Sequence, residues 1–336
     1  MSNNVLGIGI GSKNSKGEWL EVYYPKELID PIDQILLTTL ELIDFKEGEE
    51  NITRPLPISL VEYLINNNLV SKEYSSLKID DCVVVWINDK LPPYDVPSAY
   101  LMLHLLSHRL VKPNELNLEG IFNILPTVAW TSDGPKDPKD LEHILTAKKI
   151  NKESLHIHSL DKFPCMTDYV IPEGVRIADS HRVRLGAYLG EGTTVMHEGF
   201  INFNAGTLGK TMIEGRISQG VVVGKGSDLG GSSSTMGTLS GGNEGLISVG
   251  KDCLLGANSG LGIPLGDRCI IEAGLYLTAG TIVELIKSKD EVKEVKASEL
   301  AYKNDLLFVR NSLTGTVQCR PNTKSINLNE DLHSNN

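Results

Sequence analysis

The middle of the chain repeats with a period of six residues. Every sixth residue from position 171 is aliphatic in seven of eight cases: Ile171, Ile177, Val183, Leu189, Val195, Ile201, Thr207 and Ile213. The period returns at Val249, Leu255 and Leu261 and, shifted, at Leu265, Ile271 and Leu277. This hexapeptide pattern is typical of a parallel β-helix, in which each step is a short strand plus a corner and three steps complete one triangular coil. We expect the aliphatic residues to point inward and to stack from coil to coil.

The periodicity also limits the alternatives. Ordinary alternating strands would give a period of two without a preferred period of six. Two segments interrupt the repeat. Residues 226–245 are so rich in glycine and serine that they form either an extruded loop or coils with tight corners. Residues 281–300 are charged and leave the β-helix, after which residues 306–309 are predicted to form a strand.

The N-terminal part, to about Asp161, has the mixed pattern of an α/β domain. Residues 82–87 (CVVVWI) form a β-branched run that predicts a buried strand. Residues 97–111 carry apolar positions at helical spacing, and residues 140–149 predict a second, shorter helix. We therefore expect an α/β domain over residues 1–165, a parallel β-helix over residues 166–284 and a C-terminal segment over residues 285–336.

Composition narrows the function classes. Of the 32 glycines, 24 fall between Gly174 and Gly280, as small corner residues of a β-helix should. The net charge of −11 argues against a nucleic-acid partner. No apolar run approaches the roughly 20 residues that span a membrane, and no basic, then apolar, leader opens the chain. Five scattered cysteines suit reduced thiols, so we expect a cytoplasmic protein without disulfides.

Three small patterns have plain interpretations. The glycines at positions 7, 9 and 11 do not match the dinucleotide-binding G-x-G-x-x-G, because Ser12 stands where the third glycine should. His104 and His108 have metal-ligand spacing on the predicted helix, but no third ligand is indicated nearby, so a structural role is favoured. The alternation of His156 and His158 fits an ordinary strand.

Several irregular stretches of this chain resemble the tetrahydrodipicolinate N-succinyltransferase family, and in particular its actinobacterial and pseudomonad branch. The most specific is residues 192–209 (GTTVMHEGFINFNAGTLG). The others are residues 174–179, 214–218, 236–242, 254–262, 272–280, 306–312 and 328–333. Together they cover most of the chain from residue 170 onward, whereas residues 1–150 contribute little.

The resemblance implies a fold, an assembly and a reaction. The β-helix should be left-handed, and the chain should form a homotrimer with active sites between subunits. The reaction implied is transfer of a succinyl group from succinyl-CoA to the amino group of ring-opened tetrahydrodipicolinate (2-amino-6-oxopimelate), a step of lysine and diaminopimelate biosynthesis. The partners are thus small-molecule substrates and two further copies of the chain.

The resemblance also assigns residues. Glu214 follows the inward Ile213, so its side chain should point outward, and it is the implied catalytic residue. The implied succinyl-CoA site comprises Arg216, Gly231, Ser234, Ala257, Glu272, Ala273, Gly280, Lys296, Val309, Arg310, Asn311 and Ser312. Arg216 is expected to bind a carboxylate of the succinyl group or of the acceptor, and Lys296 a phosphate of CoA.

The family branch further implies Mg²⁺ on the trimer axis. Glu198 matches one ligand position, and His181 stands where the family has an aspartate. Imidazole is a poorer Mg²⁺ ligand than carboxylate, which puts His181 in doubt.

Three other functions fit the fold. A different hexapeptide-repeat N-acetyltransferase would use a catalytic histidine, for which His181 and His197 are the candidates. A zinc hydratase of the γ-carbonic-anhydrase type needs three histidines, and this β-helix offers two. A non-enzymatic scaffold needs no site at all.

Overall fold

The computed structural model describes residues 4–29, 33–46, 48–68, 70, 72–76, 78–237, 245–288 and 291–322. The chain forms two compact units. The first contains Met1–Leu105 and Glu115–Pro164, and the second contains Leu106–Asn114 and Cys165–Asn336. Two stretches that carry the family resemblance, residues 328–333 and most of 236–242, lie outside the described residues.

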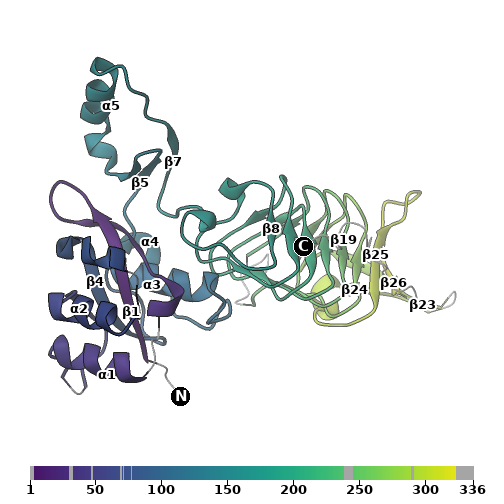
Figure 1. Cartoon of the computed structure of the whole chain (residues 1–336). Coiled ribbons are helices and arrows are strands. Elements are labelled where there is room, and N and C mark those ends of the chain that lie inside the picture. Colours follow the sequence, from purple (N-terminus) through teal and green to yellow (C-terminus); the bar gives the residue numbers. More distant parts are fainter. Residues whose placement is uncertain are drawn as a thin grey trace. The chain divides into compact units, whose positions relative to one another are not determined.

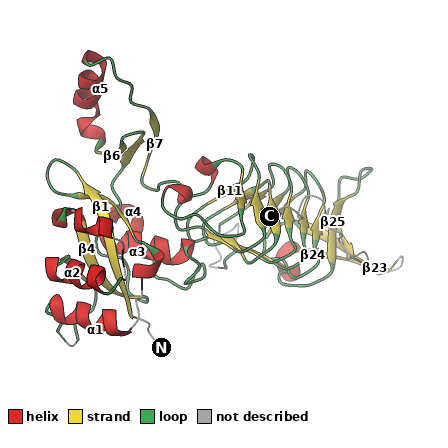
Figure 2. Cartoon of the chain, in the orientation of Figure 1, coloured by secondary structure: helices red, strands yellow, loops and turns green. Residues whose placement is uncertain are grey.

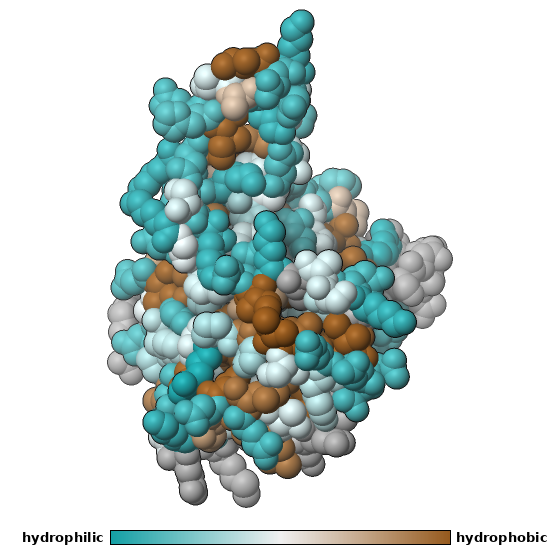
Figure 3. Space-filling view, turned by 60° about the vertical axis from the view of Figure 1, so that its left-hand side comes forward, coloured by the Kyte–Doolittle hydropathy of each residue, from teal (hydrophilic) through white to brown (hydrophobic). Residues whose placement is uncertain are grey.

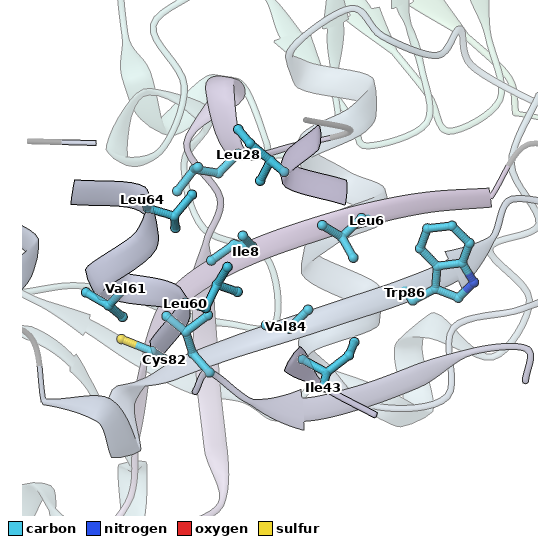
Figure 4. Close-up of a cluster of buried hydrophobic side chains, with 12 residues drawn as sticks. Leu6, Ile8, Leu28, Ile43, Leu60, Val61, Leu64, Cys82, Val84 and Trp86 are labelled. Atoms are coloured by element: carbon cyan, nitrogen blue, oxygen red, sulfur yellow. The ribbon is translucent and has the colours of Figure 1, made fainter. Parts of the chain in front are cut away.

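The first unit is built on an antiparallel sheet in the order β2-β1-β4-β3 (Figure 1). Its strands are β1 (Asn4–Lys13), β2 (Trp19–Tyr23), β3 (Ile52–Pro55) and β4 (Cys82–Asn88). Strand β4 confirms the predicted buried strand. Helices α1 (Asp33–Leu42) and α2 (Ile58–Asn66) cover one face. There Leu6 and Ile8 of β1 pack with Val84 and Trp86 of β4 and with Leu60 of α2 (Figure 4).

Helix α3 (Val96–Ser107) packs on the opposite face of β1 and confirms the predicted helix. A Cβ on Gly7 would lie 2.6 Å from Leu101, and a Cβ on Gly9 would lie 2.7 Å from Tyr24. The glycine series therefore allows close packing inside a strand and forms no nucleotide loop. His104 of this helix is fully buried: its Nε2 accepts from the Tyr24 N–H, so Nδ1 carries the proton and donates to the Tyr100 carbonyl. His104 thus has the structural role that the sequence favoured.

A small arm completes the first unit. Its sheet, in the order β6-β5-β7, contains β5 (Val128–Thr131), β6 (Gly134–Lys136) and β7 (Ile157–Asp161). Helix α5 (Leu141–Ile150) is the second predicted helix, and α4 (Ile121–Ile124) precedes the arm. None of the ten residues of α5 is buried, and Ile150 and Leu160 are exposed. On the side of the molecule drawn in Figure 3, apolar patches lie among hydrophilic side chains.

The second unit is the predicted parallel β-helix, with three sheets of short parallel strands (Figure 2). The first sheet contains β8 (Arg176–Ile177), β10 (Thr193–Val195), β13 (Thr211–Ile213), β16 (Asp228–Leu229), β19 (Leu254–Leu255) and β21 (Ile270–Ile271). The second contains β11 (Phe200–Ile201), β14 (Arg216–Ile217), β17 (Ser234–Thr235), β20 (Gly260–Gly262) and β22 (Tyr276–Thr278). The third contains β9 (Tyr188–Leu189), β12 (Gly206–Thr207), β15 (Val222–Val223) and β18 (Ser248–Val249).

The inward series is confirmed from Val183 to Ile213, where every predicted member is fully buried. The prediction was wrong for Ile171, which is 87% exposed. The first strand of the stack, β8, begins only at Arg176, so no coil encloses Ile171. Ile177 is half-buried because its strand ends the sheet and has a neighbour on one side only.

The two segments that interrupt the repeat have different structures. Residues 228–235 form β16 and β17, so the first half of the glycine-serine segment is part of the β-helix, whereas residues 238–244 lie outside the described ranges. The charged segment forms an antiparallel hairpin of β23 (Ile282–Ser288) and β24 (Glu291–Lys296). Strand β25 (Leu306–Arg310), predicted from the sequence, pairs in parallel with β21, and β26 (Val317–Pro321) joins β25 to β23.

Among the helices of the described ranges, none is both long and apolar enough to span a membrane.

Candidate active site

The candidate site lies at an unusually short corner between the first and second sheets. On the preceding coil, the inward residues flanking this corner are Val195 and Ile201, six positions apart. Their register partners one coil later are Ile213 and Ile217, only four positions apart. The corner formed by residues 214–216, the short corner, therefore lacks two residues relative to the coils on either side. The backbone turns more tightly there, so the edge of the β-helix is recessed at Glu214.

A glycine makes the short corner possible. A Cβ on Gly215 would lie 2.2 Å from Oγ of Ser233 and 2.6 Å from its carbonyl oxygen, so no larger residue fits without moving the next coil. The backbone of the short corner is hydrogen-bonded to the coil before it and to the coil after it. The N–H of Phe200 donates to the Gly215 carbonyl at 3.0 Å, and the N–H of Ser232 donates to the Glu214 carbonyl at 3.2 Å. Gly215 thus fixes where the backbone of Glu214 lies.

Glu214 is half-buried on the outside of the short corner. Its N–H donates to the Leu229 carbonyl at 2.8 Å, which fixes the residue against the next coil. Among the described residues, its carboxylate has no hydrogen-bond or ion-pair partner. A Cβ on Gly231 would lie 3.6 Å from Oε2 of Glu214, and the Gly231 N–H has no acceptor within the described ranges. A free carboxylate and a free N–H donor therefore lie side by side.

Arg216 brings a cation to the same corner. It is exposed at the start of β14, next to Ser234 in the parallel register. Its Nε and Nη2 donate to Oγ of Ser234 at 3.0 and 2.7 Å, which orients the guanidinium across the sheet. The structure thus brings four predicted residues, Glu214, Arg216, Gly231 and Ser234, to one place.

Small residues continue from the short corner along the same edge, toward the C-terminal end of the stack. The register aligns Glu214 with Gly230, Gly256 and Glu272 in the three following coils, and the next residues of those coils are Gly231, Ala257 and Ala273. We call this the small-residue row: Gly230, Gly231, Gly256, Ala257 and Ala273. Because these residues lack long side chains, the backbone of the edge is open to a long thin ligand.

The far end of the row is closed by the C-terminal segment. Oε2 of Glu272 accepts from the N–H of Arg310 at 2.7 Å, because β25 follows β21 in register. Asn311 orders the loop that follows: its side-chain oxygen accepts from the N–H groups of Leu313 and Thr314. Residues 309–312 are thus brought next to Glu272 although they lie nearly forty positions away in the sequence.

Gly280 and Lys296 lie together, but at a different corner. Gly280 follows β22 of the second sheet, and Lys296 ends β24. The N–H of Ala297 donates to the Thr281 carbonyl at 2.8 Å, which holds the two segments side by side. The structure therefore divides the predicted succinyl-CoA residues between two corners of the β-helix.

The two predicted metal ligands lie at the same edge of the β-helix as the short corner, in the two coils that precede it. Val183 pairs with Ile201, so His181 and Glu198 occupy neighbouring coils. Both are exposed, and the Glu198 carboxylate has no partner among the described residues. Nδ1 of His181 lies 3.2 Å from Oδ1 of Asp179, which also accepts from the His181 N–H and so has a lowered pKa. Glu198 fits a hard cation such as Mg²⁺, whereas the His181 imidazole fits it poorly. No group of three His, Cys, Asp or Glu residues that suits a metal exists within one chain in the described ranges.

The sequence reasoning missed a cavity of about 310 Å³ on the N-terminal side of the short corner. It is lined by Arg176, Ile177, Ala178, Thr194, Val195 and Met196. The interval of four between Ile213 and Ile217, where the repeat demands six, was the available signal for a recess. Nothing in the pattern singled out Arg176.

Comparisons with known proteins agree with this arrangement. A family model described as the tetrahydrodipicolinate N-succinyltransferase middle domain matches residues 125–164, and one described as the hexapeptide repeat of succinyl-transferase matches residues 246–279. A 2,3,4,5-tetrahydropyridine-2,6-dicarboxylate N-succinyltransferase from Pseudomonas paraeruginosa is 51% identical over 339 residues, which is 98% of each chain. One from Vibrio cholerae is 46% identical over 100% of each chain.

A solved structure from Campylobacter jejuni extends the likeness to three dimensions. It is described as a 2,3,4,5-tetrahydropyridine-2-carboxylate N-succinyltransferase, is 32% identical and has a TM-score of 0.87, over 96% of this chain and 93% of that one. The fold class is therefore a mixed α/β unit followed by a left-handed parallel β-helix and a short C-terminal extension. Since relatives this similar match over 93% or more of their length, the chain belongs to the 2,3,4,5-tetrahydropyridine-2,6-dicarboxylate N-succinyltransferase family.

Proposed function

We propose that this protein transfers a succinyl group from succinyl-CoA to the amino group of ring-opened tetrahydrodipicolinate. Family membership supports the reaction, and one observation ties it to a place. Glu214 carries a half-buried, unpaired carboxylate at the short corner, beside a free N–H and the Arg216 guanidinium. The product would be the N-succinyl amino dicarboxylate and free CoA, which serves lysine and diaminopimelate synthesis.

The chemistry asks for a base, an oxyanion donor and a carboxylate-binding group. The acceptor ammonium loses a proton, and its nitrogen attacks the thioester carbonyl carbon. The tetrahedral oxyanion then collapses, the C–S bond breaks and the CoA sulfur takes up a proton. Glu214 suits the proton-accepting role, the Gly231 N–H suits the oxyanion, and Arg216 suits the succinyl carboxylate.

The small-residue row is the proposed path of the CoA arm. Its lack of side chains suits the thin pantetheine chain, and Glu272 with residues 309–312 lies at its end. Gly280 and Lys296, at the other corner, suit the nucleotide phosphates. A molecule as long as CoA reaches both corners only by crossing one sheet.

Replacing Lys296 with alanine is expected to raise KM for succinyl-CoA roughly 2- to 5-fold, the range of an exposed ion pair. The kcat at saturating donor should stay close to that of the wild type, because a remote phosphate contact is equally present in ground and transition states. Lys293→Ala, on the same exposed strand, is the matched control. Steady-state kinetics at varied succinyl-CoA concentration measures both constants. An unchanged KM for succinyl-CoA together with a strongly lowered kcat would contradict the assignment.

We further propose a homotrimer with active sites between subunits. The support is an edge whose functional side chains point outward and an arm helix, α5, that buries none of its residues within the chain. Sedimentation equilibrium should give three times the 36.7 kDa chain mass. A monomer that is fully active at assay concentrations would refute the shared site.

Glu198, repeated three times around the trimer axis, would offer Mg²⁺ the carboxylate oxygens it prefers; His181 contributes less, and no chemical step depends on the ion. A cytoplasmic location suits five cysteines that are all free.

The deciding experiment is turnover by the purified protein with succinyl-CoA and enzymatically generated tetrahydrodipicolinate, followed by thiol release. Release of CoA that depends on the acceptor supports the proposal. Preference for acetyl-CoA and an amino sugar would indicate an acetyltransferase. Hydration of carbon dioxide would indicate a hydratase, and absence of any turnover would indicate a scaffold.

A further inference from the structure

We propose that the cavity beside the short corner binds the carbon chain of the acceptor and that Arg176 binds the acceptor's distal carboxylate. This inference rests on the proposed function and names a specificity-determining residue for it. Four observations carry it: the position of the cavity, the unpaired state of its cation, the apolar character of its accessible lining and the distance from that cation to the short corner.

The cavity lies on the opposite side of Glu214 from the small-residue row. The register Ile177↔Val195↔Ile213 aligns Ala178, Met196 and Glu214 as successive outward residues. Ala178 and Met196 line the cavity, so it begins one coil before Glu214 and extends toward the N-terminal end of the stack. The small-residue row begins one coil after Glu214. The carboxylate therefore stands between a space for the donor and a separate space for a second molecule.

Arg176 is a cation without a partner. Its guanidinium makes no hydrogen bond or ion pair with any described residue, although it lines the cavity. The neighbouring arginines are occupied: Arg182 donates to the Gly199 and Glu198 carbonyls, and Arg184 donates to Asn202. The nearby carboxylate of Asp179 already accepts from the His181 N–H. An exposed, unpaired guanidinium at the mouth of a cavity is suited to bind a carboxylate in bidentate fashion.

The accessible part of the lining suits a short methylene chain. Ala178 is exposed and Met196 and Ile177 are half-buried, and all three are apolar, whereas Thr194 and Val195 are buried and bound the cavity without offering side-chain surface to a ligand. Such a surface offers van der Waals contact to the carbons between the two ends of an amino dicarboxylate. It offers no second cation, so it does not suit the several phosphates of a nucleotide.

The distance between Arg176 and the short corner matches the acceptor. Arg176 aligns with Met212 two coils later, so the backbones of these two residues are roughly 10 Å apart at the usual strand spacing, and Glu214 lies two positions beyond Met212. The carboxyl carbons of an extended seven-carbon dicarboxylate are about 7 Å apart, six bonds of about 1.5 Å in a zigzag. With the amine near Glu214, the distal carboxylate then lies within reach of the long Arg176 side chain.

The test compares two acceptor analogues that differ only at the distal end: 2-aminopimelate, which has the second carboxylate, and 2-aminoheptanoate, which has a methyl group there. Each is measured as a competitor of the natural acceptor in wild type, Arg176→Met and Arg176→Lys. The matched control is Lys225→Met, which removes one exposed positive charge at a different corner of the β-helix. KM for succinyl-CoA is measured in parallel.

Arg176→Met is expected to raise the acceptor KM on the order of 10- to 100-fold, to leave KM for succinyl-CoA within about 2-fold, and to abolish the preference for 2-aminopimelate. Arg176→Lys should retain part of that preference, and Lys225→Met should behave as wild type. An active wild type with an unchanged acceptor KM and preference in Arg176→Met overturns the inference alone. A wild type that transfers no succinyl group overturns the proposed function on which it rests.

Discussion

Replacing Glu214 with glutamine is expected to lower kcat by roughly 10²- to 10⁴-fold, the usual contribution of a positioned acid–base group. The amide keeps the shape of the side chain but neither accepts the ammonium proton nor attacks a thioester. The half-buried carboxylate has no structural partner among the described residues, so trimer mass and thermal unfolding should be unchanged. Glu214→Ala should lose activity to the same extent.

The matched control is Glu191→Gln, an exposed carboxylate at another corner of the β-helix, which should keep wild-type kinetics. Rates from acceptor-dependent CoA release decide the comparison. A Glu214→Gln protein that retains more than about a tenth of the wild-type kcat would remove this residue from the chemistry, since even weak general bases contribute more than that.

Loss of activity alone does not separate two roles for Glu214. As a general base it takes the ammonium proton; as a nucleophile it attacks the thioester and forms a mixed anhydride that the amine then opens. A carboxylate is a weak nucleophile and an anhydride hydrolyses readily, so we favour the base. The enzyme is mixed with succinyl-CoA without acceptor, quenched in acid and digested for mass spectrometry. A succinyl adduct on the Glu214 peptide with an early burst of CoA would establish the anhydride.

Succinyl-CoA is expected to be used on the order of 10²- to 10³-fold more efficiently than acetyl-CoA, measured as kcat/KM. The proposed contact between Arg216 and the succinyl carboxylate is desolvated when both substrates are bound. Loss of one partner of such a pair costs about 2–5 kcal/mol. Arg216 is already oriented by its two bonds to Ser234, which lowers the cost of ordering it.

Arg216→Met should remove most of this preference by lowering kcat/KM for succinyl-CoA while changing that for acetyl-CoA little. Ser234→Ala, which removes the orienting hydroxyl, should give an intermediate preference. Competition of the two donors in one reaction, with products separated by mass, measures the ratio directly. Equal use of both donors by the wild type would instead favour the acetyltransferase alternative.

The β-helix was predictable because its signal is local and repeated. Leu189, Val195 and Ile201 each sit at the same position of a six-residue unit, and each is fully buried. The position at which the stack of coils begins was not predictable in the same way. Ile171 keeps the period, but burial also requires a neighbouring coil, and periodicity carries no information about where the stack begins.

The site was only partly predictable. The outward direction of Glu214 follows from its place after the inward Ile213. The contact between Glu272 and Arg310 depends on β25 pairing with β21, across a charged hairpin whose length no pattern fixes. The arm and the helices α1 and α2 carry no repeat, and the stretches that showed the family resemblance in the sequence lie outside them, although a family model matches residues 125–164. Their packing was therefore not predictable from the sequence.

The register of the stack fixes the distance between the two ends of the proposed path of the donor's CoA arm. Glu214 and Glu272 are three coil steps apart, roughly 14 Å at the usual strand spacing. This distance is a whole number of backbone steps, each bonded to the next, and it does not depend on side-chain conformation. A β-helix therefore measures the length of the carrier arm in units of one strand, and only insertion or deletion of a complete coil would adapt it to an arm of another length.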